Sequence, residues 1–292
     1  MDFGRIITAM VTPFKQDGSL DYAEAVRIAN YLADNGSDAV VLSGTTGESP
    51  TLTLEEETVL FQEVKKGLGR KAKVLAGTGS NCTATAVEST RKAEQLGLDG
   101  ALLVVPYYNK PPQEGLYQHF KAINDAVDLP LMLYNIPGRT SRNMEPETIL
   151  RLAELRNYVA VKEASGDLRQ MQKILAAAPR DFLLYAGDDN LTLDALKLGG
   201  YGVVSVAAHL VGPQMKELVN AFLSGDTARA EELQAALADI FQVIFINTNP
   251  APVKAALNLL GFNCGIPRLP LVELTDGEKE TLKKVLARHR LL

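Results

Sequence analysis

Lys162 and Tyr134 each lie at or near the end of a short apolar run, and as a pair they could carry out amine chemistry on a carbonyl compound. Such a run is typical of a buried strand, yet lysine is almost never fully buried without a partner. Burial disfavours a charged amine, and a neutral amine can attack a carbonyl carbon to form a Schiff base, while a tyrosine beside it can pass protons. The alternative is a strand-end lysine that pairs with a carboxylate, and the strand pattern alone leaves both interpretations open.

Side-chain alternation predicts which way Lys162 points. Along residues 158–163, alternate side chains face opposite sides of a strand, so Lys162 would share one face with Tyr158 and Ala160. The small Ala160 suits the crowded inside of a barrel, which places Lys162 inward. Glu163 then faces outward, and we expect it to be a structural partner behind the sheet rather than an acid in the reaction.

Polar segments follow several other predicted strands. The segment SGTTGES (43–49) could hold an anion with its backbone N–H groups and threonine hydroxyls, or could simply connect a strand to a helix. Arg139, after YNIPG, could bind a substrate carboxylate or stabilise its loop. The aspartates of GDDN (187–190) could bind a metal, but we favour a helix N-cap. Tyr107 and Tyr108 could be packing aromatics or part of an interface.

These polar residues need a scaffold that brings strand ends together, and the apolar pattern predicts one. Eight apolar runs alternate with amphipathic helical patterns, and they begin near residues 5, 38, 73, 100, 129, 158, 182 and 202. The runs are almost continuously apolar, as in a parallel sheet covered on both faces. Eight strand–helix alternations predict a (β/α)8 TIM barrel, whose active site lies at the C-terminal ends of the strands. The alternative, a doubly wound open sheet, lacks its fingerprint because GTGSNC at Gly77 has no third glycine.

Local signals also mark helix ends and a division of the chain. Thr53 before a run of glutamates predicts a helix start, and Gly36 and Gly97 predict two helix ends. The helical patterns after the eighth strand exceed what one closing helix needs. We therefore predict a barrel over residues 1–225 and a C-terminal helical extension over residues 226–292.

Composition argues against several classes of function. The 292 residues carry a net charge of −5, no tryptophan and no basic stripe, so we expect no binding to nucleic acid. No window reaches the 18 or more apolar residues of a membrane span, and the N-terminal run is too short for a signal peptide. Cys82 and Cys264 lie far apart, which favours a reduced, cytoplasmic protein. The three histidines are scattered, so we expect no metal site, and we expect His209 to be structural.

Four motifs in register carry a resemblance to a known family. GTTGE (44–48), PYYNKP (106–111), YNIPGRT (134–140) and VAVKEASGD (159–167) together resemble the dihydrodipicolinate synthase family, over nearly the whole chain. The wider superfamily, which includes N-acetylneuraminate lyase and 2-keto-3-deoxygluconate aldolase, shares only the TGE turn and the barrel lysine. The threonine pair, the YYN loop and the arginine after NIPG resemble the synthase branch.

The resemblance implies a catalytic role for four residues. Lys162 would form a Schiff base with pyruvate, and the resulting enamine would attack aspartate semialdehyde, which leads to the precursor of diaminopimelate and lysine. Tyr134, Thr45 and Tyr108 would relay protons. Tyr108 would come from a neighbouring subunit, so the resemblance implies an oligomer, with a homotetramer usual in the family and a dimer as the alternative.

Four further residues would bind the substrates. Thr46 and the backbone of its turn match the site for the pyruvate carboxylate, and Arg139 matches the group that receives the semialdehyde carboxylate. Gly187 and Val204 match positions where backbone groups line the pocket. No metal or organic cofactor is implied, because the lysine itself serves as the electron sink.

One departure from the family concerns feedback regulation. Many members are inhibited by lysine at a site between subunits, where histidines follow the GTTGE turn and a glutamate follows GTG and its asparagine. This chain has Leu54, Glu57 and Thr85 at those positions. Three other positions still match, namely Ser49, Asn81 and Tyr107. We therefore predict weak or absent lysine feedback, since charged hydrogen bonds contribute about 1.5–3 kcal/mol.

Two other functions fit parts of the pattern. A pyruvate-dependent aldolase acting on a sugar acid would use the same lysine, but Arg139 and Tyr108 argue against it. A catalytically inactive barrel could serve as a small-molecule-binding or regulatory protein, but the intact set of Lys162, Tyr134 and Thr45 argues against that.

Overall fold

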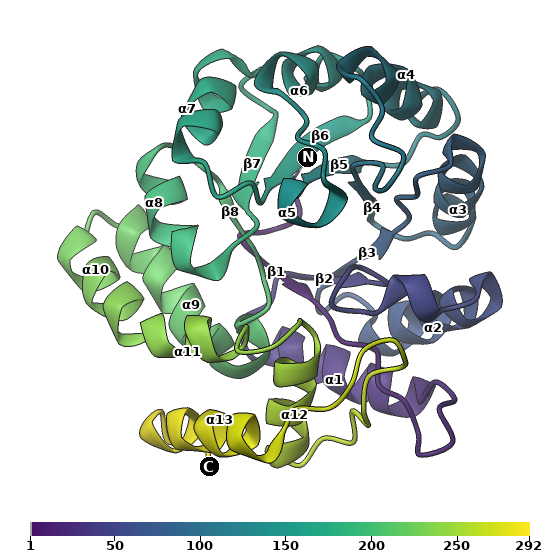
Figure 1. Ribbon diagram of the computed structural model, residues 1–292. Helices are drawn as coiled ribbons and strands as arrows, with labels where there is room; N and C mark the ends of the chain where they lie inside the picture. Colours follow the sequence, from purple (N-terminus) through teal and green to yellow (C-terminus); the bar gives the residue numbers. More distant parts are fainter. Residues whose placement is uncertain (1) are drawn as a thin grey trace.

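The eight predicted strands form a closed parallel barrel in the computed structural model, which describes residues 2–292 (Figure 1). The strands neighbour one another in chain order, and the last strand pairs with the first. They are β1 (Ile6–Ala9), β2 (Ala39–Leu42), β3 (Lys73–Gly77), β4 (Gly100–Val104), β5 (Leu131–Asn135), β6 (Tyr158–Glu163), β7 (Leu183–Ala186) and β8 (Gly202–Ser205). This closure confirms the (β/α)8 barrel and excludes an open sheet.

A ring of helices surrounds the barrel, and each strand leads into at least one of them (Figure 1). The ring consists of α1 (Tyr22–Asp34), α2 (Leu54–Leu68), α3 (Thr83–Gln95), α4 (Gln113–Asn124), α6 (Pro146–Ala153), α7 (Leu168–Ala177), α8 (Thr192–Lys197) and α9 (Ala208–Leu223). The short helix α5 (Pro137–Thr140) lies inside this ring, over the barrel (Figure 1). Short 3-10 turns precede α2 and α8, namely η1 (Ser49–Thr51) and η2 (Asp189–Leu191). No helix within residues 2–292 is both long and apolar enough to cross a membrane.

The helix ends follow the predicted local signals. Thr53 caps α2, because its hydroxyl accepts from the Glu56 N–H while the Glu56 carboxylate accepts from the Thr53 N–H. Gly36 and Gly97 follow the ends of α1 and α3 with φ angles of 102° and 67°, a region that favours glycine. Both predicted helix ends are therefore confirmed.

Side chains alternate between the inside of the barrel and the layer under the helices, with one interruption in β6. Met132 and Tyr134 of β5 and Ala160 of β6 lie in the inner cluster, as the alternation predicts. The register shifts between Leu131 and Met132, so that β6 carries an extra residue there. Tyr158 is therefore on the outside, where its hydroxyl donates to a backbone carbonyl in α4, and its predicted inward position is wrong.

Four helices follow the ring. They are α10 (Thr227–Ala236), α11 (Ala238–Val243), α12 (Ala251–Leu259) and α13 (Asp276–Arg288). In Figure 1, α12 and α13 lie outside the ring, and α13 packs against α11 and α12. The loop after α12 packs on α1, since the Phe262 ring lies 4.8 Å from that of Tyr31 and under the Arg27 guanidinium. The border that we predict at residues 225/226 falls in the turn between α9 and α10.

Candidate active site

Lys162 and Tyr134 meet at the C-terminal ends of β6 and β5. They are paired in register, and the Lys162 Nζ lies 4.2 Å from the centre of the Tyr134 ring. Both side chains are buried, with 5% and 4% of their surface exposed. Among residues 2–292 the ammonium makes no hydrogen bond or ion pair, so the alternative of a carboxylate-paired lysine finds no partner in this part of the chain.

Two aspartates after β7 are the anionic groups that act on Lys162. Burial raises the pKa of Asp188 and of Asp189, and the positive charge of Lys162 partly opposes this rise for both. Asp189 is nearly fully buried and accepts from the Ser205 hydroxyl and from the N–H groups of Val206 and Ala207. Asp188 stands at the N-cap position of η2, but its side chain makes no capping hydrogen bond, and Asp189 instead binds N–H groups just before α9. The N-cap role that we predict for these aspartates is therefore wrong.

A cavity of about 320 Å³ opens at the same end of the barrel. Three predicted residues, Thr45, Tyr134 and Arg139, line it. The other predicted residues do not form its wall: Thr46, Lys162 and Val204 are buried, Gly187 is partly buried, and Tyr108 is exposed. Lys162 thus lies against the ring of Tyr134, which is a residue of the cavity wall.

The turn that follows β2 has an unusual backbone. Ser43 and Glu48 have φ angles of 52° and 58°, which non-glycine residues rarely adopt. A Cβ at Gly47 would lie 2.9 Å from the Ser43 backbone nitrogen, so this turn requires a glycine there. The Thr12 hydroxyl donates to the Gly47 carbonyl and ties the turn to the segment after β1. Strained backbone of this kind is concentrated at functional sites.

Arg139 stands at the mouth of the cavity on the short helix α5. Its side chain is exposed and makes no ion pair within the described residues. The loop after it is anchored by Asn135, whose side chain accepts from the Met144 N–H and donates to Asn143. A guanidinium held there without an internal partner is suited to a planar carboxylate.

Glu163 has the structural position that alternation predicts. It is fully buried behind the sheet and accepts from the side chains of Asn135 and Gln170 and from the Ser165 N–H. Burial raises the pKa of this carboxyl, and these hydrogen bonds oppose the rise. The network joins β5, β6 and α7 behind Tyr134 and Lys162.

The remaining predicted residues are explained by local geometry. A Cβ at Gly187 would lie 2.4 Å from the Ala164 Cβ, so only glycine allows β7 to approach the loop after β6. Val204 belongs to the inner cluster of the barrel. His209 is fully buried, accepts from the Val11 N–H at Nε2 and bonds the Val206 carbonyl through Nδ1, and burial lowers its pKa to about 4. This neutral, doubly bonded imidazole fits its predicted structural role.

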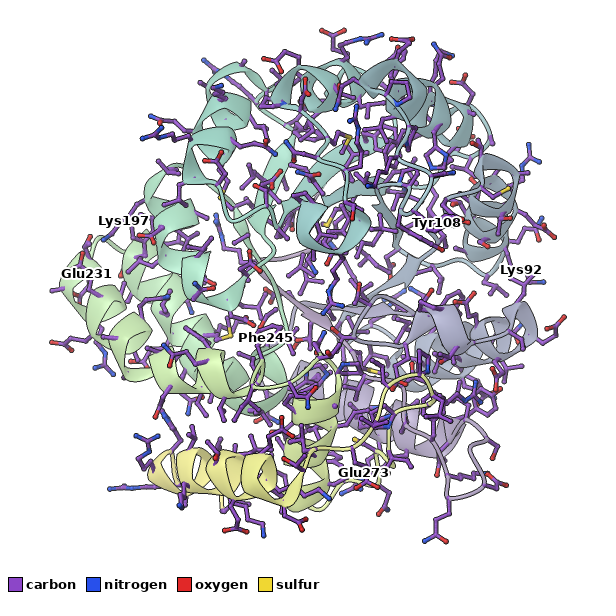
Figure 2. All side chains as sticks on the ribbon, viewed as in Figure 1. Lys92, Tyr108, Lys197, Glu231, Phe245 and Glu273 are labelled. Atoms are coloured by element: carbon purple, nitrogen blue, oxygen red, sulfur yellow. The ribbon has the colours of Figure 1, made fainter. Side chains whose placement is uncertain are left out.

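Tyr107 and Tyr108 lie on the loop between β4 and α4. Tyr107 contributes to the cavity wall, whereas Tyr108 is 89% exposed and has a φ angle of 74° (Figure 2). A large aromatic side chain displayed in this way is typical of an interface residue.

The contribution of the C-terminal segment to the cavity could not be predicted from the sequence. Thr248, Asn249, Pro270 and Leu271 all line the cavity, and the Asn249 Nδ2 donates to the Thr46 hydroxyl over 2.9 Å. These positions are more than 200 residues from the turn that they face, so no local motif connects them. Within residues 2–292, no group of three or more His, Cys, Asp or Glu side chains is placed to hold a metal ion.

Comparison with known proteins gives a consistent result. The model of the dihydrodipicolinate synthetase family matches residues 2–289. A 4-hydroxy-tetrahydrodipicolinate synthase of Thermosynechococcus vestitus is 59% identical over 98% of this chain and 97% of the relative, and one of Moorella thermoacetica is 57% identical over 100% of both. A crystal structure of the Cyanidioschyzon merolae enzyme with lysine bound is 51% identical, covers 99% of both chains and superimposes with a TM-score of 0.98.

Proposed function

Because this chain belongs to the dihydrodipicolinate synthetase family and has the activity of a 4-hydroxy-tetrahydrodipicolinate synthase, we propose that the cavity described above is its active site and Lys162 its nucleophile. The activity is a lyase reaction through a Schiff base, in the biosynthesis of diaminopimelate and lysine. It condenses pyruvate with L-aspartate 4-semialdehyde. The observation that carries the assignment is a buried lysine without an ionic partner, in contact with a tyrosine of the cavity wall.

Lys162 carries the covalent chemistry. Its neutral amine attacks the keto carbon of pyruvate, and loss of water gives the Schiff base. Loss of a proton from the methyl group gives an enamine, which attacks the aldehyde carbon of the semialdehyde. The amino group of the new chain then displaces the lysine and closes the ring. The protonated imine serves as the electron sink, so the proposal needs no metal or organic cofactor.

Tyr134, Thr45 and Tyr108 move the protons. The Tyr134 ring lies against the amine, and Thr45 lines the same cavity as Tyr134. Tyr108 is too exposed to act within its own subunit, and we propose that it completes the relay of a neighbouring subunit. The enzyme is then an oligomer, a homotetramer or a dimer.

Two sites hold the substrate carboxylates. Thr46 and the backbone of its turn bind the carboxylate of pyruvate, and Arg139 binds that of the semialdehyde at the mouth of the cavity. Backbone groups of Gly187 and Val204 line the pocket near Lys162. The two free cysteines and the biosynthetic role support a cytoplasmic location.

We further propose that lysine inhibits this enzyme weakly or not at all. Thr85 is exposed and carries no charge, and Leu54 is 39% exposed. Glu57 does not replace the missing carboxylate, because burial raises its pKa to about 7 and leaves it only partly ionised near neutrality.

Reduction with borohydride in the presence of pyruvate tests the assignment of Lys162. We expect a stable pyruvate-derived mass adduct on Lys162, found by peptide mass spectrometry, and almost complete loss of turnover in Lys162→Ala. Lys173→Ala, which removes an exposed lysine of α7, is the matched control and should retain both the adduct and the turnover. A folded enzyme without an adduct, or with the adduct on another lysine, would overturn the proposal.

A further inference from the structure

The C-terminal segment holds the turn after β2 at two points, both on or next to the short helix α12. Asn249, just before α12, donates to the Thr46 hydroxyl over 2.9 Å. Lys254, within α12, pairs with the Glu48 carboxylate over 2.8 Å. All four side chains are at least 95% buried. One rigid element therefore grips a turn that lies about 200 residues earlier in the chain.

The contact from Asn249 decides what the Thr46 hydroxyl can do. A hydroxyl has one proton to donate and two lone pairs. Because Thr46 accepts from the Asn249 amide and makes no other hydrogen bond within the described residues, its own proton is free to be donated. The Asn249 Oδ1 is buried and also has no partner in the described structure. Asn249 lines the cavity, and Thr46 lies buried directly behind it, in contact with Asn249 and next to Thr45 of the wall.

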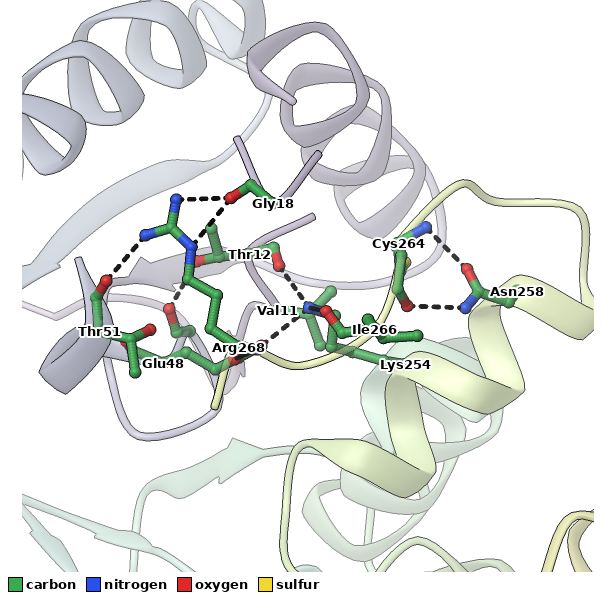
Figure 3. A network of polar contacts seen from close by, with 12 residues as sticks. Val11, Thr12, Gly18, Glu48, Thr51, Lys254, Asn258, Cys264, Ile266 and Arg268 are labelled. Carbon is green, nitrogen blue, oxygen red and sulfur yellow. Dashed lines mark hydrogen bonds and ion pairs between the residues drawn. The ribbon is translucent and has the colours of Figure 1, made fainter. Parts of the chain in front are cut away.

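The contact from Lys254 fixes the backbone that carries Thr46. The Lys254 ammonium donates to three oxygens, the Glu48 carboxylate and the carbonyls of Thr12 and Ile266 (Figure 3). The other Glu48 oxygen accepts from the Arg268 N–H. Every donor of the ammonium is thus used, and both carboxylate oxygens of Glu48, whose backbone is left-handed, are held.

The Arg268 side chain adds further contacts to the same turn. We call the contacts that Asn249, Lys254 and Arg268 make with this turn the clamp. Its guanidinium donates to the carbonyls of Gly18 and Thr51 (Figure 3). It also donates to the Glu56 carboxylate. Thr51 ends the turn and Glu56 lies in the first turn of α2. The clamp therefore spans the whole connection from β2 to α2.

We propose that Asn249 is a positioning residue that presents the Thr46 hydroxyl as a hydrogen-bond donor to the carboxylate of the 2-keto acid, with α12 held in place by the Lys254–Glu48 pair. This inference rests on the proposed function, since it assumes that Thr46 binds that carboxylate. It makes a residue of the C-terminal segment part of substrate recognition, although the segment lies outside the barrel.

A double-mutant cycle tests the coupling of Asn249 to Thr46. Thr46→Val and Asn249→Leu keep the side-chain shapes and remove the hydroxyl and the amide. Each should raise the KM for pyruvate about tenfold or more, because a hydrogen bond to a charged group is lost or misdirected. The double variant should be no worse than Thr46→Val alone. Effects that multiply, or an unchanged KM in Asn249→Leu, would overturn the inference.

Asn249→Asp tests the direction of the bond. A carboxylate can only accept, so it would draw the Thr46 proton away from the cavity, and the KM for pyruvate should rise further than in Asn249→Leu. The same substitution in the Thr46→Val background measures the repulsion of the substrate by the new charge alone. An equal rise in both backgrounds would contradict the proposed direction.

Asn258→Leu is the matched control for a general loosening of α12. Asn258 also lies in α12 and binds the backbone of Gly265 and Cys264, but it does not contact the turn (Figure 3). Its KM for pyruvate should stay within about twofold of the unaltered enzyme, and an increase equal to that of Asn249→Leu would show a merely structural role.

The borohydride adduct at saturating pyruvate separates the two proposals. Its absence in the unaltered enzyme overturns the proposed function, whereas its presence with an unchanged KM in Asn249→Leu overturns this inference alone.

Discussion

Two buried lysines show how the surroundings of a residue set its role. Lys162 and Lys254 each lie 4.2 Å from the centre of an aromatic ring, Tyr134 and Phe14 respectively. Lys254 also pairs with a buried carboxylate and has all three donors in use. Lys162 has no such partner among the described residues, so its amine is the one available for reaction with a carbonyl compound.

At the same scale, three side chains predict the response to lysine. Leu54, Glu57 and Thr85 stand where inhibited members of the family have histidines and a glutamate. We expect turnover at saturating substrates to be unchanged by lysine at about 1 mM, because the charged hydrogen bonds that would hold it are missing. Thr85→Glu combined with Leu54→His and Glu57→His should introduce inhibition. Inhibition of the unaltered enzyme at sub-millimolar lysine would refute the prediction.

His209 predicts a loss of stability in acid. Its folded pKa of about 4 lies below the ordinary value of 6.5, so the folded protein binds fewer protons than the unfolded chain between these pH values. Stability therefore falls as the pH is lowered from 6.5 to 4, by about 3 kcal/mol for this residue. In His209→Gln, whose amide oxygen can still accept from the Val11 N–H, the free energy of unfolding should decrease less over that range. Parallel pH profiles for the two proteins would count against this account.

At the scale of elements, sequence patterns predicted the features that depend on residues close together in the sequence. The eight strands, the Thr53 cap and the glycines after α1 and α3 all follow from residues within a few positions of each other. The inward position predicted for Tyr158 was wrong, because the extra residue in β6 depends on how β5 pairs with it. No local pattern could predict the contacts of Asn249 and Lys254, because their partners lie 203 and 206 residues away in the sequence.

The contact between α12 and the turn after β2, through the Lys254–Glu48 pair, should contribute to the free energy of unfolding. Lys254→Met should lower the free energy of unfolding by about 3–5 kcal/mol, because it leaves a buried carboxylate without its partner. Adding Glu48→Gln should recover most of that loss, since the uncompensated charge is then gone. Chemical denaturation of the three proteins measures both effects.

An exposed ion pair provides the control for this contact. Lys283 and Glu280 of α13 pair at the surface, with side chains 45% and 59% exposed. Lys283→Met should leave the unfolding free energy nearly unchanged, because exposed pairs contribute little. If Lys254→Met proved as mild as this control, the buried pair would not be what holds α12 on the turn.

At the scale of the whole molecule, the exposed apolar side chains indicate a missing neighbour. Leu54, Val59, Tyr107 and Tyr108 are 37–89% exposed and come from α2 and the loop after β4. Exposed side chains of this kind are candidates for a protein–protein interface. A second subunit would cover them and would receive Tyr108 in its active site.

Complementation between two inactive variants tests this sharing of residues. Tyr108→Phe and Lys162→Ala should each be nearly inactive alone. Mixed dimers contain one site with both residues intact, so random pairing should recover about a quarter of the original specific activity. Mixed dimers, isolated through a different affinity tag on each variant, should show this activity directly. Isolated mixed dimers without activity would show that Tyr108 does not act across subunits.

The clamp on the turn after β2 also has a consequence in time. During synthesis Glu48 leaves the ribosome 206 residues before Lys254, a delay of roughly 10–40 s at about 5–20 residues per second. For the last 92 residues of that interval, from Lys162 to Lys254, the growing chain holds both the lysine proposed as nucleophile and the threonine turn, but not the helix that packs on the turn. Competence to bind substrate would then arrive only with the last part of the message, and a chain released early would be a barrel without a working pocket.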